Sequence, residues 1–145
     1  MSTNIKNPTD IQFLATYGTL RDDNDSYAPW AKDFTKNISH AVTGKLAEYR
    51  LYGHPKMNYP FAVHTGDPND TIVVRLLSWP SKEEFAEKII QADMIEGDEY
   101  ERKIVEVSVK DNGIKYAYVY VSKLKISDKT WTKIPSGDWL QRHFK

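Results

Sequence analysis

The chain has 145 residues, with 20 basic and 20 acidic side chains and no cysteine. This length fits one domain, so we expect a single domain over residues 1–145, with residues 1–10 as a frayed lead-in. The balanced charge argues against capture of nucleic acid or of an acidic membrane. The absence of cysteine excludes disulfides, thiolate metal sites and a cysteine nucleophile, and no apolar run is long enough to span a membrane. We therefore expect a soluble, cytoplasmic protein.

Apolar runs bounded by turn residues predict about six strands. The run Ile11–Tyr17 stops at Gly18, which is typical of a buried strand that leads into a turn. Thr71–Trp79 is the clearest strand, and its nearly continuous apolar sequence predicts burial on both faces. The other strands are expected at Ile38–Tyr49, Tyr59–Val63, Lys103–Val109 and Tyr116–Val121.

Glycine and polar clusters mark the connections between these strands. Gly44, inside the second strand, predicts a bulge or a close approach of two strands. The sequence GDPND at 66–70 predicts a turn, and DNG at 111–113 predicts a hairpin between the last two strands. Residues 21–37 have no steady periodicity and are expected to form a long loop. The side chains expected to pin this loop to the body are Tyr27, Trp30 and Phe34.

One helix is predicted between the fourth and fifth strands. Ser81 stands three residues before Glu84, which is the capping-box spacing at the start of a helix. The helix is expected to end within residues 92–95, where Gly97 then allows the chain to reverse. Its apolar stripe consists of Phe85, Ile89 and Ala92. Together the elements predict an α+β fold: a small mixed, mostly antiparallel β-barrel of about six strands with one main helix.

Several kinds of chemistry have no motif in this sequence. The chain contains no GxSxG elbow, P-loop or GxGxxG fingerprint, which argues against serine hydrolases, NTPases and dinucleotide enzymes. The acidic cluster at 22–25 lacks the glycine and glutamate of a calcium loop, and we expect no metal. The basic segment 122–145 suits RNA or single-stranded DNA in principle, but we favour packing of Trp131 and Trp139 against the sheet. The four histidines, which lack the spacing of a local zinc motif, are His40, His54, His64 and His143.

Four motifs in series carry a resemblance to a known family. They are YGTLR at 17–21, VTGKL at 42–46 with Tyr59 and Pro60 after it, Asp93, Glu96 and Gly97 followed by Tyr100 and Arg102, and SGDW at 136–139. In this order, and over nearly the whole chain, they resemble the γ-glutamylcyclotransferase-like superfamily, which includes γ-glutamylamine cyclotransferases and plant AIG2-like proteins. The resemblance implies a mixed barrel and an intramolecular aminolysis without a cofactor. The α-amine of a γ-glutamyl group attacks its own γ-carbonyl and gives 5-oxoproline and a free amine.

The resemblance also implies roles for particular residues. Glu96 is expected to be the general acid and base, and the backbone of Tyr17, Gly18, Thr19 and Leu20 is expected to bind the glutamyl group. These roles make chemical sense, because a carboxylate can take a proton from the attacking ammonium and return it to the leaving nitrogen. The amides of a glycine turn can bind a carboxylate or an oxyanion. Tyr17 is expected to wall the substrate site.

Tyr100 and Arg102 have further expected roles, and two other positions depart from the family pattern. Tyr100 is expected to line the substrate site or to donate a hydrogen bond to the substrate. Arg102 is expected to pair with a nearby acid as a structural partner. Val74 and Arg75 stand where the family usually has a glycine and an acid, and the loop at 21–37 is expected to select the leaving amine.

The expected partner is a small γ-glutamyl substrate, with no nucleic acid and no membrane, and the expected assembly is a monomer or a small homo-oligomer. The alternative is a catalytically silent module that binds a small molecule or another protein. In that case YGTL is only the end of a strand and Glu96 is only a surface acid. The retention of Glu96 beside Gly97 favours the enzyme.

Overall fold

The computed structural model describes residues 11–18, 21, 34–53, 60–110, 113–122 and 132–141. One helix longer than a single turn, α2 (Lys82–Glu96), lies in this part of the chain, together with the 3-10 turns η2 (Gly97–Glu99) and η3 (Trp139–Gln141). The strands of the described residues are β1 (Leu14–Thr16), β2 (His40–Ala47), β3 (Tyr49–Gly53), β4 (Phe61–His64), β5 (Thr71–Ser78), β6 (Tyr100–Val109), β7 (Gly113–Ser122) and β8 (Thr132–Lys133).

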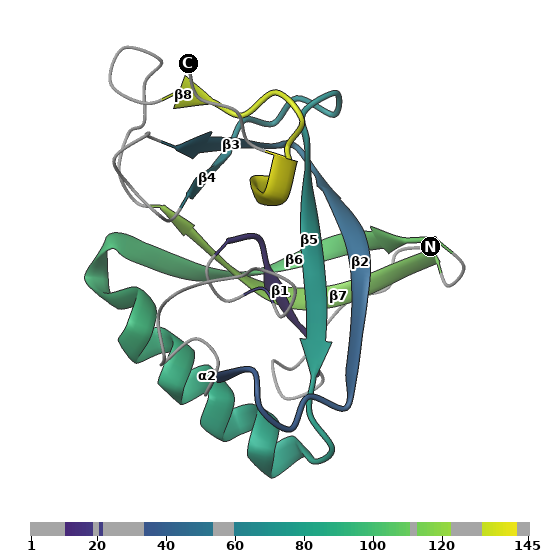
Figure 1. Cartoon of the computed structure of the whole chain (residues 1–145), viewed down its shortest axis with the longest axis vertical. Coiled ribbons are helices and arrows are strands. Elements are labelled where there is room, and N and C mark those ends of the chain that lie inside the picture. Colours follow the sequence, from purple (N-terminus) through teal and green to yellow (C-terminus); the bar gives the residue numbers. More distant parts are fainter. Residues whose placement is uncertain are drawn as a thin grey trace.

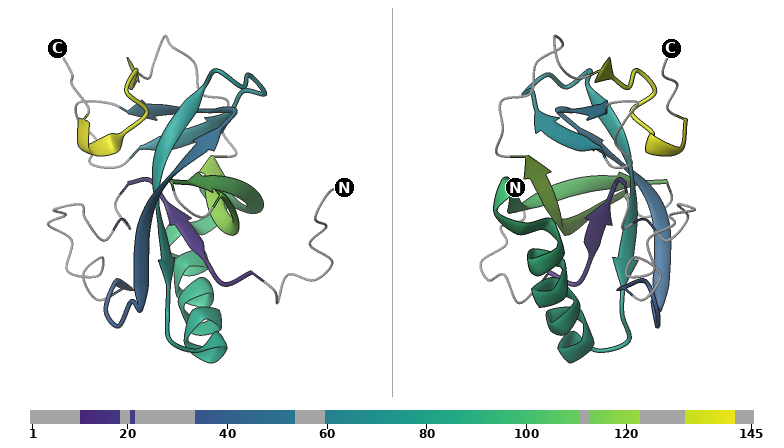
Figure 2. Two further views of the ribbon diagram at one scale, coloured as in Figure 1. Left: turned by 90° about the vertical axis from the view of Figure 1, so that its right-hand side faces the viewer. Right: turned by 60° about the vertical axis from the view of Figure 1, so that its left-hand side comes forward.

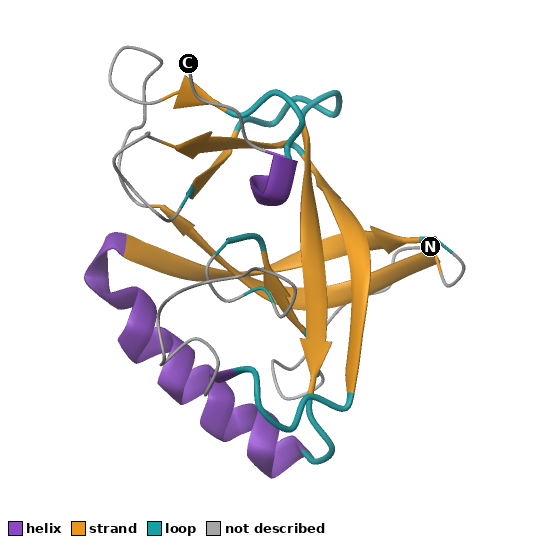
Figure 3. Cartoon of the chain, in the orientation of Figure 1, coloured by secondary structure: helices purple, strands orange, loops and turns teal. Residues whose placement is uncertain are grey.

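Five strands close into a barrel in the order β1-β5-β2-β6-β7, and three form a small sheet in the order β4-β3-β8 (Figure 1). All barrel pairs are antiparallel except β1 with β7, so the barrel is mixed. The small sheet and η3 lie at one end of the molecule, and α2 runs along the barrel at the other end (Figures 2 and 3). The predicted fold class, an α+β barrel with one main helix, is confirmed.

The predicted strands agree with the observed ones to different degrees. β5 ends one residue before the predicted boundary, and the predicted hairpin is present with longer strands, paired from Tyr100↔Ser122 to Val109↔Gly113. β1 is shorter than the predicted run, and β8 was not predicted. The lead-in at 1–10, residues 22–33 of the expected loop, and Asp111 and Asn112 of the DNG turn lie outside the described residues.

The barrel interior is filled by alternate residues of its strands. On β5 the side chains of Ile72, Val74 and Leu76 are completely buried inside, whereas Val73 and Arg75 face outward and are half-buried. The predicted burial of β5 on both faces is therefore wrong over most of its length. Only near its end does the outer face meet other apolar groups, because Leu77 packs with the helix.

The helix α2 attaches to the outside of the barrel through the predicted stripe. Phe85, Ile89 and Ala92 are buried in a second apolar cluster together with residues of β1, β5 and β7. The predicted cap is confirmed, because the Ser81 hydroxyl oxygen accepts a hydrogen bond of 3.1 Å from the backbone N–H of Glu84. No helix in the described part of the chain is long and apolar enough to cross a membrane.

A left-handed residue separates β2 from β3. Glu48 has a φ of 72°, its N–H donates to the carbonyl of Asp70 at 2.7 Å, and its carbonyl accepts from the N–H of Thr65 at 2.8 Å. These bonds turn the chain from the barrel into the small sheet. The predicted single strand Ile38–Tyr49 is corrected accordingly, because it ends at Ala47 and a new strand begins at Tyr49.

The predicted features at Gly44, at 66–70 and at Phe34 have clear outcomes. Strand β2 pairs with β5 in unbroken register, and a Cβ on Gly44 would lie 2.5 Å from Cγ1 of Val107, so this glycine permits close approach and makes no bulge. The GDPND turn is confirmed by a 2.9 Å bond from the Asp70 N–H to the Asp67 carbonyl. Phe34 is completely buried.

Two glycines with positive φ provide a test of the packing around the C-terminal segment. Gly137 has a φ of 69°, and a Cβ there would lie 2.2 Å from the Thr71 carbonyl oxygen, whereas Gly66 has a φ of 75° and open space around the added carbon. Gly137→Ala should therefore lower the free energy of unfolding by about 3 kcal/mol or more. Gly66→Ala should cost about 1 kcal/mol, from backbone strain alone. Equal losses in urea denaturation would contradict the described contact with Thr71.

Candidate functional site

The predicted catalytic residue Glu96 is the last residue of α2, at the point where the chain reverses into β6. Gly97 makes the reversal with φ 71° and ψ −163°, and its N–H donates to the carbonyl of Asp93. The reversal requires glycine for its backbone conformation, since an added Cβ would meet no atom within 4 Å. The sequence Glu96–Gly97 thus closes the helix and begins the approach to Tyr100.

Burial changes the acidity of Glu96. Removal of the carboxyl from water raises its pKa from an ordinary 4.5 to about 7, because the ionised form loses hydration. Glu96 is half-buried. A carboxyl with this pKa can both accept and release a proton near neutral pH, which an ordinary surface glutamate does poorly.

Tyr17 lies close enough to Glu96 for their charges to interact. Burial raises the pKa of the Tyr17 hydroxyl well above its usual value, and the negative charges of Glu96 and Tyr100 raise it further. A hydrogen bond with the Ala62 backbone lowers this pKa, but by less. The hydroxyl donates to the carbonyl of Tyr120 at 2.5 Å. The phenol therefore stays protonated at neutral pH and links β7 to β4. Tyr17 itself is almost completely buried.

Gly18 and Tyr100 meet the same residue, Pro60. A Cβ on Gly18 would lie 2.4 Å from Cδ of Pro60, so only glycine lets the strand end approach this ring. The Tyr100 hydroxyl donates to the Pro60 carbonyl at 3.4 Å, and the Tyr100 ring stacks on Phe61 with ring centroids 5.7 Å apart. Pro60 thus contacts both Gly18 and Tyr100, two of the residues predicted to bind the substrate. Thr19 and Leu20 lie outside the described residues.

The sequence did not single out Phe61 as part of this region. Its stacking on Tyr100 joins β4 to the start of β6, a contact between segments about 40 residues apart. The one signal for it in the sequence is its position directly after Pro60, at the start of an apolar run. An aromatic at that place has many possible partners, so the contact required the structure.

Arg102 has the structural role predicted for it. Its guanidinium donates to both carboxylate oxygens of Asp93, at 2.9 Å and 2.7 Å, and lies over the Tyr118 ring at 4.9 Å. The Tyr120 hydroxyl donates to the same carboxylate at 2.5 Å. Asp93 stands one turn before Glu96 on α2, so these contacts tie the end of the helix to β6 and β7.

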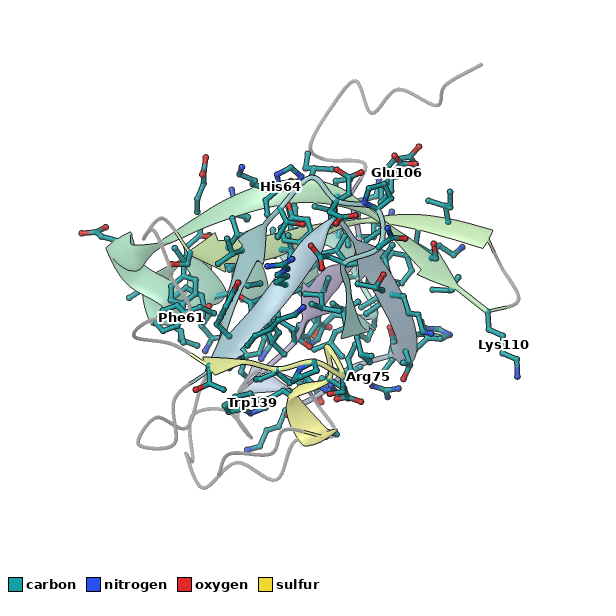
Figure 4. The ribbon with its side chains drawn as sticks, turned by 90° about the horizontal axis from the view of Figure 1, so that it is seen from above. Phe61, His64, Arg75, Glu106, Lys110 and Trp139 are labelled. Carbon is teal, nitrogen blue, oxygen red and sulfur yellow. The ribbon has the colours of Figure 1, made fainter. Side chains whose placement is uncertain are left out.

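Arg75 faces away from the barrel interior. Its guanidinium donates to the Thr43 hydroxyl at 2.9 Å, and its carbonyl accepts from the Thr16 hydroxyl at 3.2 Å. The guanidinium of Arg75 thus bonds to β2, and its backbone carbonyl bonds to β1. Figure 4 shows Arg75 apart from Phe61, on which Tyr100 stacks.

Among the described residues, no group of three or more His, Asp or Glu side chains is arranged to hold a metal ion. His40 and His64 belong to this part of the chain, whereas His54 and His143 do not. His64 lies 3.4 Å from the Glu48 carboxylate and packs edge-on against the Tyr49 ring. Trp139 is completely buried in the barrel cluster, as favoured for the C-terminal segment, and Trp131 lies outside the described residues.

The raised pKa of Glu96 has a consequence for stability that does not depend on activity. Because the pKa in the folded state is above the unfolded value, the protonated carboxyl fits the fold better than the ionised one. The free energy of unfolding of the wild type should fall relative to that of Glu96→Gln as the pH rises from about 4.5 to about 7. Above that range the difference should stay constant. The control is Glu87→Gln, which removes an exposed carboxyl from the same helix, keeps Glu96 and should follow the wild-type curve. A parallel pair of curves for wild type and Glu96→Gln would contradict the burial of Glu96.

Comparison with known proteins places this arrangement in a family. The sequence profile described as Gamma-glutamyl cyclotransferase, AIG2-like matches residues 14–141. No curated protein sequence matches the chain. Similar solved structures share its fold. An uncharacterized protein from Pyrococcus horikoshii is 24% identical, with 88% of this chain and 89% of that chain covered and a TM-score of 0.60. An AIG2-like protein from Mus musculus is 13% identical (93% of this chain and 86% of that chain covered, TM-score 0.56), and a gamma-glutamyl cyclotransferase is 12% identical (84% of this chain and 69% of that chain covered, TM-score 0.52). The chain belongs to the Gamma-glutamyl cyclotransferase, AIG2-like family.

Proposed function

We propose that this protein is a γ-glutamyl cyclotransferase that converts a γ-glutamyl amide into 5-oxoproline and a free amine, with Glu96 as general acid and base. The observation that carries the proposal is the half-buried carboxyl of Glu96 with a pKa of about 7, beside Tyr17 at the end of β1. Membership of a family that includes γ-glutamyl cyclotransferases supports the same reaction class.

The attacking nitrogen must lose two protons in this reaction, because the α-ammonium carries three hydrogens and the ring nitrogen of 5-oxoproline carries one. The ionised Glu96 takes a proton from the α-ammonium, and the free amine then attacks the γ-carbonyl carbon. A new C–N bond closes the five-membered ring as the old γ-amide C–N bond breaks, and Glu96 passes its proton to the leaving nitrogen. The ionised Glu96 then takes the second proton from the ring nitrogen and releases it to the freed amine or to water. A carboxyl of pKa near 7 is suited to these transfers, because neither protonation state is strongly favoured.

The remaining task is to hold the substrate in a folded conformation. Since nucleophile and electrophile belong to one molecule, correct orientation contributes much of the rate. In our proposal the backbone amides of residues 17–20 bind the negatively charged groups of the glutamyl moiety, and Tyr100 lines the same region. The stacking of Tyr100 on Phe61 and its bond to Pro60 support this role, because they fix the ring beside the end of α2.

The activity can be tested with a panel of γ-glutamyl amines, γ-glutamyl amino acids and larger γ-glutamyl conjugates. The wild type should release 5-oxoproline from at least one of them, and Glu96→Gln should lower kcat by about 100-fold or more, because the proton carrier is lost. Glu87→Gln, which removes an exposed carboxyl from the same helix, should keep wild-type kcat. Full turnover by Glu96→Gln would disprove the mechanism, and binding without turnover by the wild type would favour a silent binding module.

The pH dependence of the rate gives a separate test. Since Glu96 must be ionised to accept the proton from the ammonium, kcat/KM should rise with pH through a midpoint near 7. The same midpoint should appear with different leaving amines, because it belongs to the free enzyme. A profile that is flat from pH 5 to pH 8 would rule out Glu96 as the base.

A further inference from the structure

The SGDW segment is built firmly against the barrel and the small sheet. The Gly137 carbonyl accepts from the Val73 N–H at 2.7 Å, and the Ile134 N–H donates to the Leu51 carbonyl at 2.8 Å. Trp139 is completely buried in the barrel cluster. In Figure 1 the turn η3 lies beside the upper part of β5. The segment thus has a fixed place of its own, independent of the residues proposed to bind substrate.

Asp138 projects from this segment to a buried cation. Its Oδ1 lies 2.8 Å from a guanidinium nitrogen of Arg21, whose side chain is only 3% exposed. The same Oδ1 accepts the Leu140 N–H at 3.0 Å, and the Asp138 N–H donates to the Ser136 hydroxyl at 3.2 Å. The carboxylate is therefore oriented by its own segment. A buried guanidinium requires such a partner, because an uncompensated charge inside a protein is strongly unfavourable.

Arg21 in turn is bonded to the glycine turn. Its backbone N–H donates to the Gly18 carbonyl at 3.0 Å, across the two residues that the structure does not describe. At the other end of this bond Gly18 is pressed against Pro60. A chain of contacts thus leads from Asp138 through Arg21 to Gly18, and it joins the YGTLR and SGDW motifs, which stand 117 residues apart at Arg21 and Asp138.

We propose that Asp138 is a positioning residue for substrate binding: through its ion pair with Arg21 it keeps the Arg21 N–H on the Gly18 carbonyl, and so fixes Gly18, whose backbone is proposed to bind the glutamyl group. This inference rests on the proposed function. Asp138 takes no part in proton transfer, so its loss should weaken binding of the substrate and leave the chemistry of Glu96 unaltered. A role in stability alone would have a different result, because it would affect folding without changing KM.

The chain offers a matched control in a second Arg–Asp pair. Arg50 Nε lies 3.0 Å from Asp70 Oδ2, and the Asp70 side chain is 11% exposed. Asp70 also accepts from the Thr65 hydroxyl at 2.7 Å, so it is as firmly bonded as Asp138. This pair joins β3 to the turn before β5. Asp70→Asn and Asp138→Asn therefore remove the same charge from Arg–Asp pairs in two places, although the Arg50 side chain is more exposed (35%) than that of Arg21 (3%).

The two variants are compared at a temperature well below the unfolding midpoint of either. Asp138→Asn should raise KM by about ten- to a hundred-fold, with kcat within about threefold of wild type and an unchanged pH midpoint. In native-state hydrogen exchange, the Arg21 amide should exchange faster in this variant, because its bond to Gly18 is loosened. Asp70→Asn should leave KM, kcat and exchange of the Arg21 amide as in the wild type.

The results separate this inference from the proposed function. An unchanged KM in Asp138→Asn, or an equal rise in KM in Asp70→Asn, would overturn the positioning role while leaving the cyclotransferase activity in place. If the wild type forms no 5-oxoproline from any γ-glutamyl compound, the proposed function fails. Hydrogen exchange of the Arg21 amide is then the one remaining test of whether Asp138 positions the backbone of Arg21 against Gly18. Equal exchange rates in the two variants would then overturn the positioning role.

Discussion

The burial of one carboxyl group, that of Glu96, is the constraint on which the proposed chemistry depends. The last fully buried residue of the α2 stripe is Ala92, the partly buried Ile95 packs against the same cluster, and the helix ends at the next residue, Glu96. Gly97 then reverses the chain, and the Glu96 side chain is half-buried at this reversal. An ionised carboxylate held there loses hydration, which raises its pKa toward neutrality, as the proposed role in proton transfer requires.

The rest of the site keeps this environment in place. The end of α2 is tied to β6 and β7 by the Asp93–Arg102 pair and the Tyr120 hydroxyl, and Tyr17 connects β7 with β4 through its own hydroxyl. The Tyr17 hydroxyl is buried and is satisfied by the Tyr120 carbonyl, whereas the Asp93–Arg102 pair is partly exposed. Burial is the cause of the shifted pKa of Glu96. The residues that make these structural hydrogen bonds are thus different from Glu96, the residue proposed to transfer the proton.

The sequence predicted the elements that depend on local interactions. The Ser81 cap, the stripe of α2 and the β6–β7 hairpin follow from spacing within a few residues. The break at Glu48 was missed because bonds to Thr65 and Asp70 impose its left-handed conformation, and no glycine marks it. Strand β8 was missed for a similar reason, since its pairing with β3 joins segments about 80 residues apart. The family resemblance selected Glu96, Tyr17, Gly18 and Tyr100, but the meeting of Gly18 and Tyr100 at Pro60 is a tertiary contact that no local pattern encodes.

The central claim is that the fold makes Glu96 a proton carrier near neutral pH. The most direct measurement is an NMR titration of the Glu96 side-chain carboxyl in the free protein, with carbon-13 label at the carboxyl carbon and Glu96→Gln to assign the signal. The account predicts a midpoint near pH 7, well above the ordinary 4.5 of a glutamate. A midpoint close to 4.5 would show an ordinary surface carboxylate and would contradict the account.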